Sequence, residues 1–571
     1  MSSIVLVLIG LLVFYLGFRF YSKFIGNRIF GIDQENISMP AQEFEDGVDF
    51  VPTKKHILFG HHFTSIAGAA PIVGPCIAAF WGWLPALLWI LIGTIFMGGV
   101  HDFGALVTSV KEKGRSIADI SSTVISKRVR LMFLVFVIML VWLVLAVFAI
   151  VIAGLFVKHP TSVLPINIEI IVAIGVGWLI YKKKVDSLVP SLIALGILYL
   201  FVWMGTIIPI DLPVQNPKNL WLILLFIYSG IASLLPVWTL LQPRDFINSH
   251  QLFVGLGLLF LGIFIAQPTV EAPPIRSLSE SGVEGLFPLL FVTIACGAIS
   301  GFHGLVASGT SSKQLEKLSD ARMIGYGGMI GEGTLALAST VAAVAGISLV
   351  TRSDLPNVRD AIVGKTNWEV YYDTWAHALE NTSEAFVLGG GALIEALGIP
   401  AEIATTLMVV LVISFAATTL DTATRIQRFV LSEFGSAANI RPLTNRYLGT
   451  IVALIPAMLL AFWNIVDPVT RDPKQVGLIL WPIFGASNQM LAALTLMVLT
   501  LYYWQQKKPI LPLIIPMLVI MVITFTALML MAFENYGTNP ILFGLTMVLM
   551  GLIIWMAYEG VNKVLEIRRT S

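Results

Sequence analysis

Four ionisable side chains inside apolar stretches are the residues of this sequence best able to carry chemistry. They are His61, His62, Asp102 and Glu332. An ionisable group at such a position is costly unless it is paired, and it commonly marks a proton or substrate pathway. We therefore predict that these four groups couple a proton to the activity of the protein. A static hydrogen bond to a neighbouring helix is the alternative for each of them.

Further polar groups offer other roles. His303 is a candidate for substrate binding, with a structural hydrogen bond as the alternative. His101 precedes Asp102, and because consecutive helical side chains diverge by about 100°, we expect the two not to share a face. Asp421 and Arg425 lie four residues apart, a spacing that predicts an interfacial ion pair. A cytoplasmic gate is the alternative role for that pair.

Glycine and proline interrupt two apolar stretches close to their midpoints. Proline removes a backbone hydrogen bond and glycine frees the backbone, so each stretch is predicted to unwind there; a simple kink is the alternative. Unwound backbone at bilayer depth survives only when it is buried in protein or lines a cavity. The half-helix N-termini favour an anionic substrate group. The predicted substrate-binding residues are Ser65, Gly68, Ala69, Ala70 and Pro71 in the first stretch, and Ser229, Gly230 and Ser233 in the second.

The composition shows what must hold these residues in place. Of 571 residues, 57% are hydrophobic and 12% are charged, and the mean hydropathy is +0.86. A soluble domain carries about 25% charged residues, so this chain is predicted to be an all-α polytopic protein of the lipid bilayer. The net charge of +1 and the two cysteines argue against a nucleic-acid surface and a disulfide framework. No zinc-protease motif or complete phosphate-binding loop is present, so neither an enzyme nor a cofactor is expected.

Runs of about 20 apolar residues predict about 15 membrane spans. The first run has its basic residues after it rather than before it, so we interpret it as a retained helix and not as a signal peptide. The predicted spans are 3–20, 57–80, 84–109, 131–156, 166–181, 187–209, 219–241, 251–267, 286–311, 323–350, 400–424, 445–463, 475–502, 509–533 and 540–558.

Basic residues set the predicted orientation, because cytoplasmic loops carry an excess of Lys and Arg. They crowd the loops 111–130, 182–184 and 425–446 and the C-terminal tail. They are sparse in the loops 158–165, 210–218, 268–285 and 464–474. All the basic segments fall on one side of the membrane if the N-terminus is outside and the C-terminus is cytoplasmic.

The two interrupted spans are the second and the seventh, and they run in opposite directions in this topology. Interrupted helices at corresponding positions indicate an inverted repeat with the binding site between them. We therefore predict a five-plus-five helix core with peripheral helices, which leaves surface for a homo-oligomer. The stretch 385–397 is too short to span and is predicted to lie across the outer mouth. The predicted parts are 1–56, a first helix and acidic linker; 57–209, the first repeat; 210–430, the inverted second repeat with an outside segment 351–399; and 431–571, peripheral helices.

Long blocks of the sequence resemble the carbon starvation protein A family. They are DGVDFVPT at 46–53, FGHHFTSIAGAAPIVGP at 59–75, LPVW to LQPRD within 235–245, SGFH to SGT within 300–310, and WPIFGASNQ at 481–489. The resemblance implies a bacterial inner-membrane transporter with the leucine-transporter-type core of the amino acid–polyamine–organocation superfamily. Members have been assigned to peptide uptake during starvation, and some relatives to proton-coupled pyruvate import.

The same resemblance suggests a sodium site. In sodium-coupled transporters with this repeat, a helix of the second half supplies paired hydroxyls to the ion. Thr310 and Ser311, with Ala307 one turn earlier, stand at the end of the ninth predicted span and could provide hard oxygen ligands. The alternative is that the hydroxyls bond back to their own helix.

Taken with the resemblance, these residues predict a secondary active transporter that imports a small carboxylate nutrient by proton symport. Pyruvate is favoured over short peptides because no charged pair stands where a peptide amino terminus would need a partner. A peptide transporter of the same family, coupled to sodium, is the first alternative. A membrane receptor or channel is the alternative from another class, and the lack of a continuous polar pore counts against it.

Overall fold

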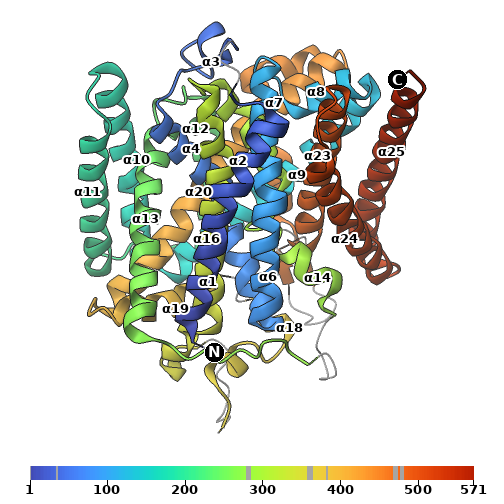
Figure 1. The fold of residues 1–571 in the computed structure, drawn as a ribbon. Coiled ribbons are helices and arrows are strands. Elements are labelled where there is room, and N and C mark those ends of the chain that lie inside the picture. The colour runs from blue at the N-terminus through green and yellow to red at the C-terminus, as the bar shows by residue number, and fades with distance from the viewer. Residues whose placement is uncertain are drawn as a thin grey trace.

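The computed structural model describes residues 2–33, 37–277, 285–355, 364–380, 383–466, 473–475 and 481–570. Within them the chain is a bundle of helices (Figure 1). Twelve helices are long and apolar enough to cross a membrane, and a thirteenth span results if one bent pair counts as one. The N- and C-termini lie at opposite ends of the bundle, as an odd number of crossings requires (Figure 1). The predicted class, an all-α polytopic membrane protein, is confirmed.

The helices have the following bounds. The first half contains α1 Ser3–Leu16, α2 Ser22–Ile25, α3 Pro40–Glu43, α4 Lys55–Ala67, α5 Ala70–Ala78, α6 Trp83–Gly93, α7 Gly99–Lys111, α8 Ile117–Val124, α9 Lys127–Lys158, α10 Val163–Gly177, α11 Leu188–Ile207, α12 Pro217–Leu234 and α13 Leu241–Ala266. The second half contains α14 Leu286–Thr293, α15 Gly301–Gly309, α16 Gly327–Val344, α17 Asn367–Tyr371, α18 Trp375–Glu380, α19 Glu384–Glu395, α20 Ala401–Ala437, α21 Arg446–Phe462, α23 Trp481–Gln505, α24 Leu511–Asn535 and α25 Pro540–Thr570. A short antiparallel pair, β1 Asn464–Val466 and β2 Pro473–Gln475, follows α21.

The second span is broken where glycine and proline predicted it. Its halves α4 and α5 meet at an angle of 43°. Gly68 adopts φ +53° and ψ −159°, a conformation open to glycine and strained for other residues. A Cβ atom there would lie 2.7 Å from the Thr419 hydroxyl oxygen of α20, so the break also packs too closely for a side chain.

The prediction that the seventh span is broken is wrong. Helix α12 continues through Ser229, Gly230 and Ser233 and ends at Leu234, so Pro236 lies beyond the helix and not inside it. The second broken span is instead the ninth. Helices α14 and α15 are separated by residues 294–300, with Gly297 at φ +91° in the gap. A Cβ atom on Gly297 would touch the Pro71 Cβ atom at 3.4 Å, so the two breaks lie against each other.

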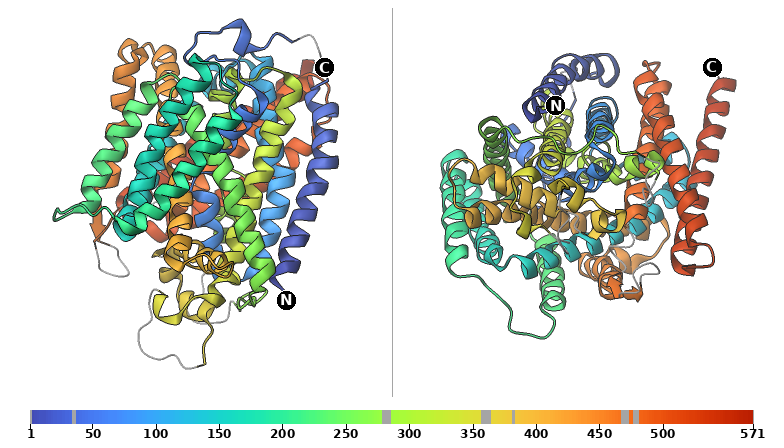
Figure 2. Two further views of the ribbon diagram at one scale, coloured as in Figure 1. Left: turned by 90° about the vertical axis from the view of Figure 1, so that its left-hand side faces the viewer. Right: turned by 90° about the horizontal axis from the view of Figure 1, so that it is seen from below.

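The other helices pack in a similar way in the two halves of the chain. The long helices α9 and α20 pack along each other in the middle of the bundle, and α12 and α21 each pack on both of them. The two broken spans have their own neighbours: α13 packs on α4, and α23 packs on α15. Each broken helix therefore packs on a later helix of its own half. We propose that the second repeat begins at α14, and that α10 and α11 are an inserted hairpin. That hairpin forms one edge of the bundle, opposite α24 and α25 (Figures 1 and 2).

Several span predictions stay open. The predicted span 286–311 is the pair α14 and α15, and 445–463 is the 17-residue helix α21; neither is among the twelve long helices. Residues 476–480 of the predicted span 475–502 lie outside the described residues. In the segment predicted to lie outside, the Trp368 indole N–H donates to the Ala79 carbonyl at 3.3 Å and the Tyr372 hydroxyl donates to the Cys76 carbonyl at 2.7 Å. These bonds hold the segment over the end of α5.

Candidate functional site

Three helices bring a chain of buried acids and imidazoles together beside the second break. The Asp102 carboxylate (α7) contacts the His101 Nδ1 atom at 2.8 Å and the His303 Nδ1 atom (α15) at 3.0 Å. The His303 Nε2 atom lies 3.4 Å from the Glu332 carboxylate (α16). All four side chains are fully buried. We call these four residues the His303 chain.

The divergence expected of His101 and Asp102 around α7 does not keep their side chains apart, because the His101 Nδ1 atom lies 2.8 Å from the Asp102 carboxylate. Their Cβ atoms diverge around α7, but both side chains are long enough for their tips to meet. The consequence is a continuous line of four titratable groups, in which His303 joins Asp102 to Glu332. Both acids were predicted to carry a proton, and His303 was predicted to bind substrate.

Glu332 ties this chain to the broken backbone. Its Oε1 atom accepts the Gly297 N–H at 3.1 Å, while the Gly297 carbonyl accepts the Thr94 hydroxyl at 2.9 Å. Backbone groups in a break need such partners because no helical bond satisfies them. The Glu332 carboxylate therefore contacts both a titratable imidazole and the non-helical segment.

Three types of metal-ligating side chain gather at one end of the His303 chain. One ligand atom each of Cys296, His303 and Glu332 lies within 4.8 Å of the others. The His303 Nδ1 atom is hydrogen-bonded to Asp102, whereas its Nε2 atom and the Glu332 Oε2 atom lie 3.4 Å apart and have no hydrogen-bond partner among the described residues. The Cys296 sulfur accepts a hydrogen bond from the Asn488 amide at 3.3 Å.

A second buried network lies around Arg244 of α13. The Arg244 guanidinium donates to Asp421 of α20, to Asp245 at 3.0 Å and to the Tyr228 hydroxyl at 2.7 Å. Asp245 in turn contacts the His61 Nδ1 atom at 2.6 Å. We call these five residues the Arg244 network. It joins α4, α12, α13 and α20.

Sequence reasoning missed most of this network. Asp421 was predicted to pair with Arg425, but Arg425 binds Asp49 at 2.7 Å and the carbonyl oxygen of Leu235. Asp421 has Arg244 as its partner. The only sequence signal was Arg244 and Asp245 standing together just after Pro243. Spacing within one helix could not reveal a partner more than a hundred residues away.

The predicted substrate residues separate into two places. Ser65, Gly68, Ala69, Ala70 and Pro71 are buried at or beside the first break. The Ser65 hydroxyl lies 3.3 Å from the Thr422 hydroxyl. Ser229 and Ser233 instead donate to carbonyl oxygens of their own helix, and Gly230 packs on Leu454 of α21. These three residues therefore line neither break.

The residues predicted for a sodium site lie beside His61 and His62 of α4. His62 Nδ1 lies 2.8 Å from the Ser311 hydroxyl, and the Thr310 hydroxyl lies 3.5 Å from the His61 Nε2 atom. Thr310 also donates back to the carbonyl oxygen of Val306, the alternative that the sequence left open. Ala307 is buried in α15. The sodium site stays a prediction.

Comparison with known proteins identifies a family and several relatives of this chain. The profile of the family described as carbon starvation protein CstA matches residues 2–527. The peptide transporter CstA of Campylobacter jejuni is 32% identical over 87% of this chain and 76% of its own. The pyruvate/proton symporter BtsT of Escherichia coli is 30% identical over 94% of this chain and 82% of its own.

Solved structures were compared as well. A mutant of the manganese transporter of Eremococcus coleocola aligns over 92% of this chain and 99% of its own, with 15% identity and a TM-score of 0.48. MhsT in complex with L-phenylalanine aligns over 83% of this chain and 99% of its own, with 12% identity and a TM-score of 0.48.

Spanning helices, two facing breaks and buried charge chains define a multi-pass membrane transporter. The chain belongs to the carbon starvation protein CstA family.

Proposed function

We propose that this transporter imports a small carboxylate nutrient, with pyruvate as the favoured substrate, in symport with protons. The observation that carries the proposal is His303, fully buried between the carboxylates of Asp102 and Glu332. If the two acids needed only a neutralising charge, a lysine or an arginine between them would be sufficient. An imidazole can also exchange a proton with either carboxylate. The similarity to a pyruvate/proton symporter supports the same conclusion.

The contact between Glu332 and Gly297 gives a way to couple the proton to the substrate. An ionised carboxylate accepts a backbone N–H about twice as strongly as a neutral acid. A proton that moves from His303 to Glu332 therefore weakens the hold on Gly297. The second break is then freer to change shape, together with the first break that touches it at Pro71.

The substrate site that fits this coupling is the place where the two breaks meet. The half-helices α5 and α15 begin there, at Ala70 and Gly301, and their positive ends favour a carboxylate. Of the predicted residues, Ser65 and the segment 68–71 from the first break belong to this site. Ser229, Gly230 and Ser233 are left out because they lie on an unbroken helix.

Two alternatives keep specific support. Several relatives are named peptide transporters, so a short peptide is the second candidate substrate. Thr310 and Ser311 lie beside α4, so a sodium ion is the second candidate coupling ion. A receptor or channel has no such support, because the relatives are named as transporters.

Reconstitution tests the proposal directly. Purified protein in liposomes should accumulate labelled pyruvate when an inward proton gradient is imposed, and an excess of unlabelled dipeptide should not compete. Uptake without a response to the proton gradient would contradict proton coupling. Competition by the dipeptide, or uptake that needs sodium and is lost in Thr310→Ala, would establish the alternatives.

A further inference from the structure

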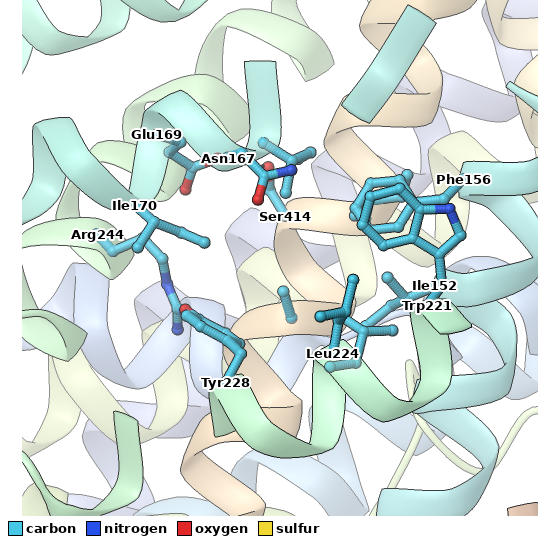
Figure 3. Close-up of a pocket in the computed structure, with 14 residues that line it drawn as sticks. Ile152, Phe156, Asn167, Glu169, Ile170, Trp221, Leu224, Tyr228, Arg244 and Ser414 are labelled. Carbon is cyan, nitrogen blue, oxygen red and sulfur yellow. Dashed lines mark hydrogen bonds between the residues drawn. The ribbon is translucent and has the colours of Figure 1, made fainter. Parts of the chain in front are cut away.

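A pocket outside the two breaks has a carboxylate with no cationic partner. It lies between α9, α10, α12, α13 and α20 (Figure 3). Figure 3 shows Asn167, Glu169 and Ser414 gathered at one side, and Phe156 with Trp221 at the other. Most of the remaining wall is aliphatic, formed by Ile152, Ile166, Ile170, Leu224, Leu225, Ile413 and Ala417.

Glu169 is the polar group that this pocket leaves unsatisfied. Its residue is 4% exposed, its Oε2 atom accepts the Ser414 hydroxyl at 2.9 Å, and its Oε1 atom has no hydrogen-bond partner among the described residues. No described basic side chain lies within ion-pairing distance of it. A buried carboxylate in such a state needs a proton or a cation.

The neighbouring Arg244 is not an ion-pair partner of Glu169, although its Nε atom has no hydrogen-bond partner among the described residues. Arg244 lines the same pocket, but its two terminal nitrogens already bind Asp421 and Asp245. One guanidinium thus pairs with two buried carboxylates and lines a pocket with a third. Even with a proton on His61, which contacts Asp245, this group of side chains is short of one positive charge.

We propose that this pocket is a second ligand site, which takes a primary ammonium group attached to an apolar body. The ammonium binds Glu169, and the apolar body lies against Phe156 and Trp221. The pocket reaches the lipid-facing side of α12, where Leu224 is 42% exposed. Two sources have this chemistry: a soluble apolar amine, and the head group of phosphatidylethanolamine.

The test compares probes of equal size and different charge. Purified full-length protein in phosphatidylcholine nanodiscs is unfolded thermally, with tryptophan fluorescence as the signal, in the presence of phenethylamine, 2-phenylethanol or phenylacetate. A ligand that binds only the folded state raises the unfolding temperature as its concentration increases. We expect such a rise with phenethylamine alone. Empty nanodiscs with the same probes correct for partition into the lipid.

Variants and lipids then locate the site and its source. Glu169→Gln should abolish the rise, or weaken the apparent affinity roughly tenfold or more, while the exposed Glu402→Gln at the start of α20 should keep it. If phosphatidylethanolamine in the disc removes the effect of added amine in wild-type protein, the lipid is the occupant. If the effect survives that lipid, a soluble amine is.

Two results would overturn the proposal. One is an equal rise with the neutral alcohol and the amine, which would mean that apolar contact alone is at work. The other is an unchanged amine effect in a folded Glu169→Gln protein. The comparison of probes on wild-type protein decides the matter even if the variant fails to fold, and it does not depend on the proton chain or on pyruvate uptake.

Discussion

At the scale of single residues, the buried charges form two groups, which differ in whether their members can exchange protons. In the His303 chain every member can gain or lose a proton, and one carboxylate also holds the second break. In the Arg244 network the central guanidinium stays charged, so its two aspartates are fixed partners. We therefore expect changes in the His303 chain to alter coupling, and changes in the Arg244 network to alter stability first.

The first prediction concerns Glu332. Glu332→Gln keeps the size of the side chain and an acceptor for Gly297, but it cannot take a proton from His303. We expect exchange of labelled for unlabelled pyruvate across liposomes to persist while accumulation driven by a proton gradient is lost. The exposed variant Glu402→Gln should retain both activities. Gradient-driven accumulation at the wild-type level in Glu332→Gln would show that Glu332 does not carry the proton.

The second prediction concerns Asp421. Asp421→Asn removes one of two charges that offset a guanidinium only 2% exposed, and the loss of a buried ionic partner typically costs about 3–5 kcal/mol. The free energy of unfolding, measured with denaturant in detergent, should fall accordingly. Asp186→Asn is the matched control, because Asp186 is exposed and pairs with Lys54 at 3.9 Å, an interaction worth about 0–1 kcal/mol. Equal losses in the two variants would contradict a structural role for the network.

At the scale of elements, the sequence predicted one break correctly and misplaced the other. Gly68 and Pro71 interrupt the second span as expected. The other prediction relied on Pro236 and on counting five spans onward, and it failed because the hairpin α10–α11 adds two helices before the second break. Gly297 gave a signal, but its spacing from Gly301 also fits ordinary close packing of helices. The local sequence pattern can predict where one helix breaks. Which other broken helix faces it depends on contacts between helices that are distant in the sequence.

The third prediction tests the second break. In Gly297→Ala the new Cβ atom would lie 2.8 Å from the Ala336 Cβ atom, and a φ of +91° disfavours any side chain. We expect gradient-driven uptake to fall sharply, with a loss of stability of about 1–2 kcal/mol from the backbone alone. Gly551→Ala in α25 meets nothing within 4 Å, so it should leave uptake unchanged and stabilise its helix by up to about 1 kcal/mol. A Gly297→Ala protein with full uptake would exclude this break from the transport site.

At the scale of the whole molecule, the charge of the loops and the geometry of the bundle constrain the orientation together. The termini lie at opposite ends, so one of them is cytoplasmic and the other is outside (Figure 1). The loop at 182–184 carries three lysines, whereas the loop 210–216 at the other end of α11 carries no basic residue. Because lysine-rich loops remain on the cytoplasmic side, the loop 182–184 is predicted to be cytoplasmic. The C-terminal tail is predicted to lie on the same side as this loop, and it is therefore predicted to be cytoplasmic as well.

The fourth prediction turns this orientation into a labelling experiment. Lys183 and Gln215 are both exposed and lie on opposite sides of α11, and the native Cys76 and Cys296 are buried, so a cysteine at either loop is the reactive one. In intact cells a membrane-impermeant maleimide should label Gln215→Cys and spare Lys183→Cys, and both should react once the membrane is opened. The reverse labelling pattern would show that the orientation in the membrane is opposite to the predicted one. The half-helix α4, which carries His61 and His62 and is predicted to be the cytoplasmic half of the broken span, would then lie on the outer side.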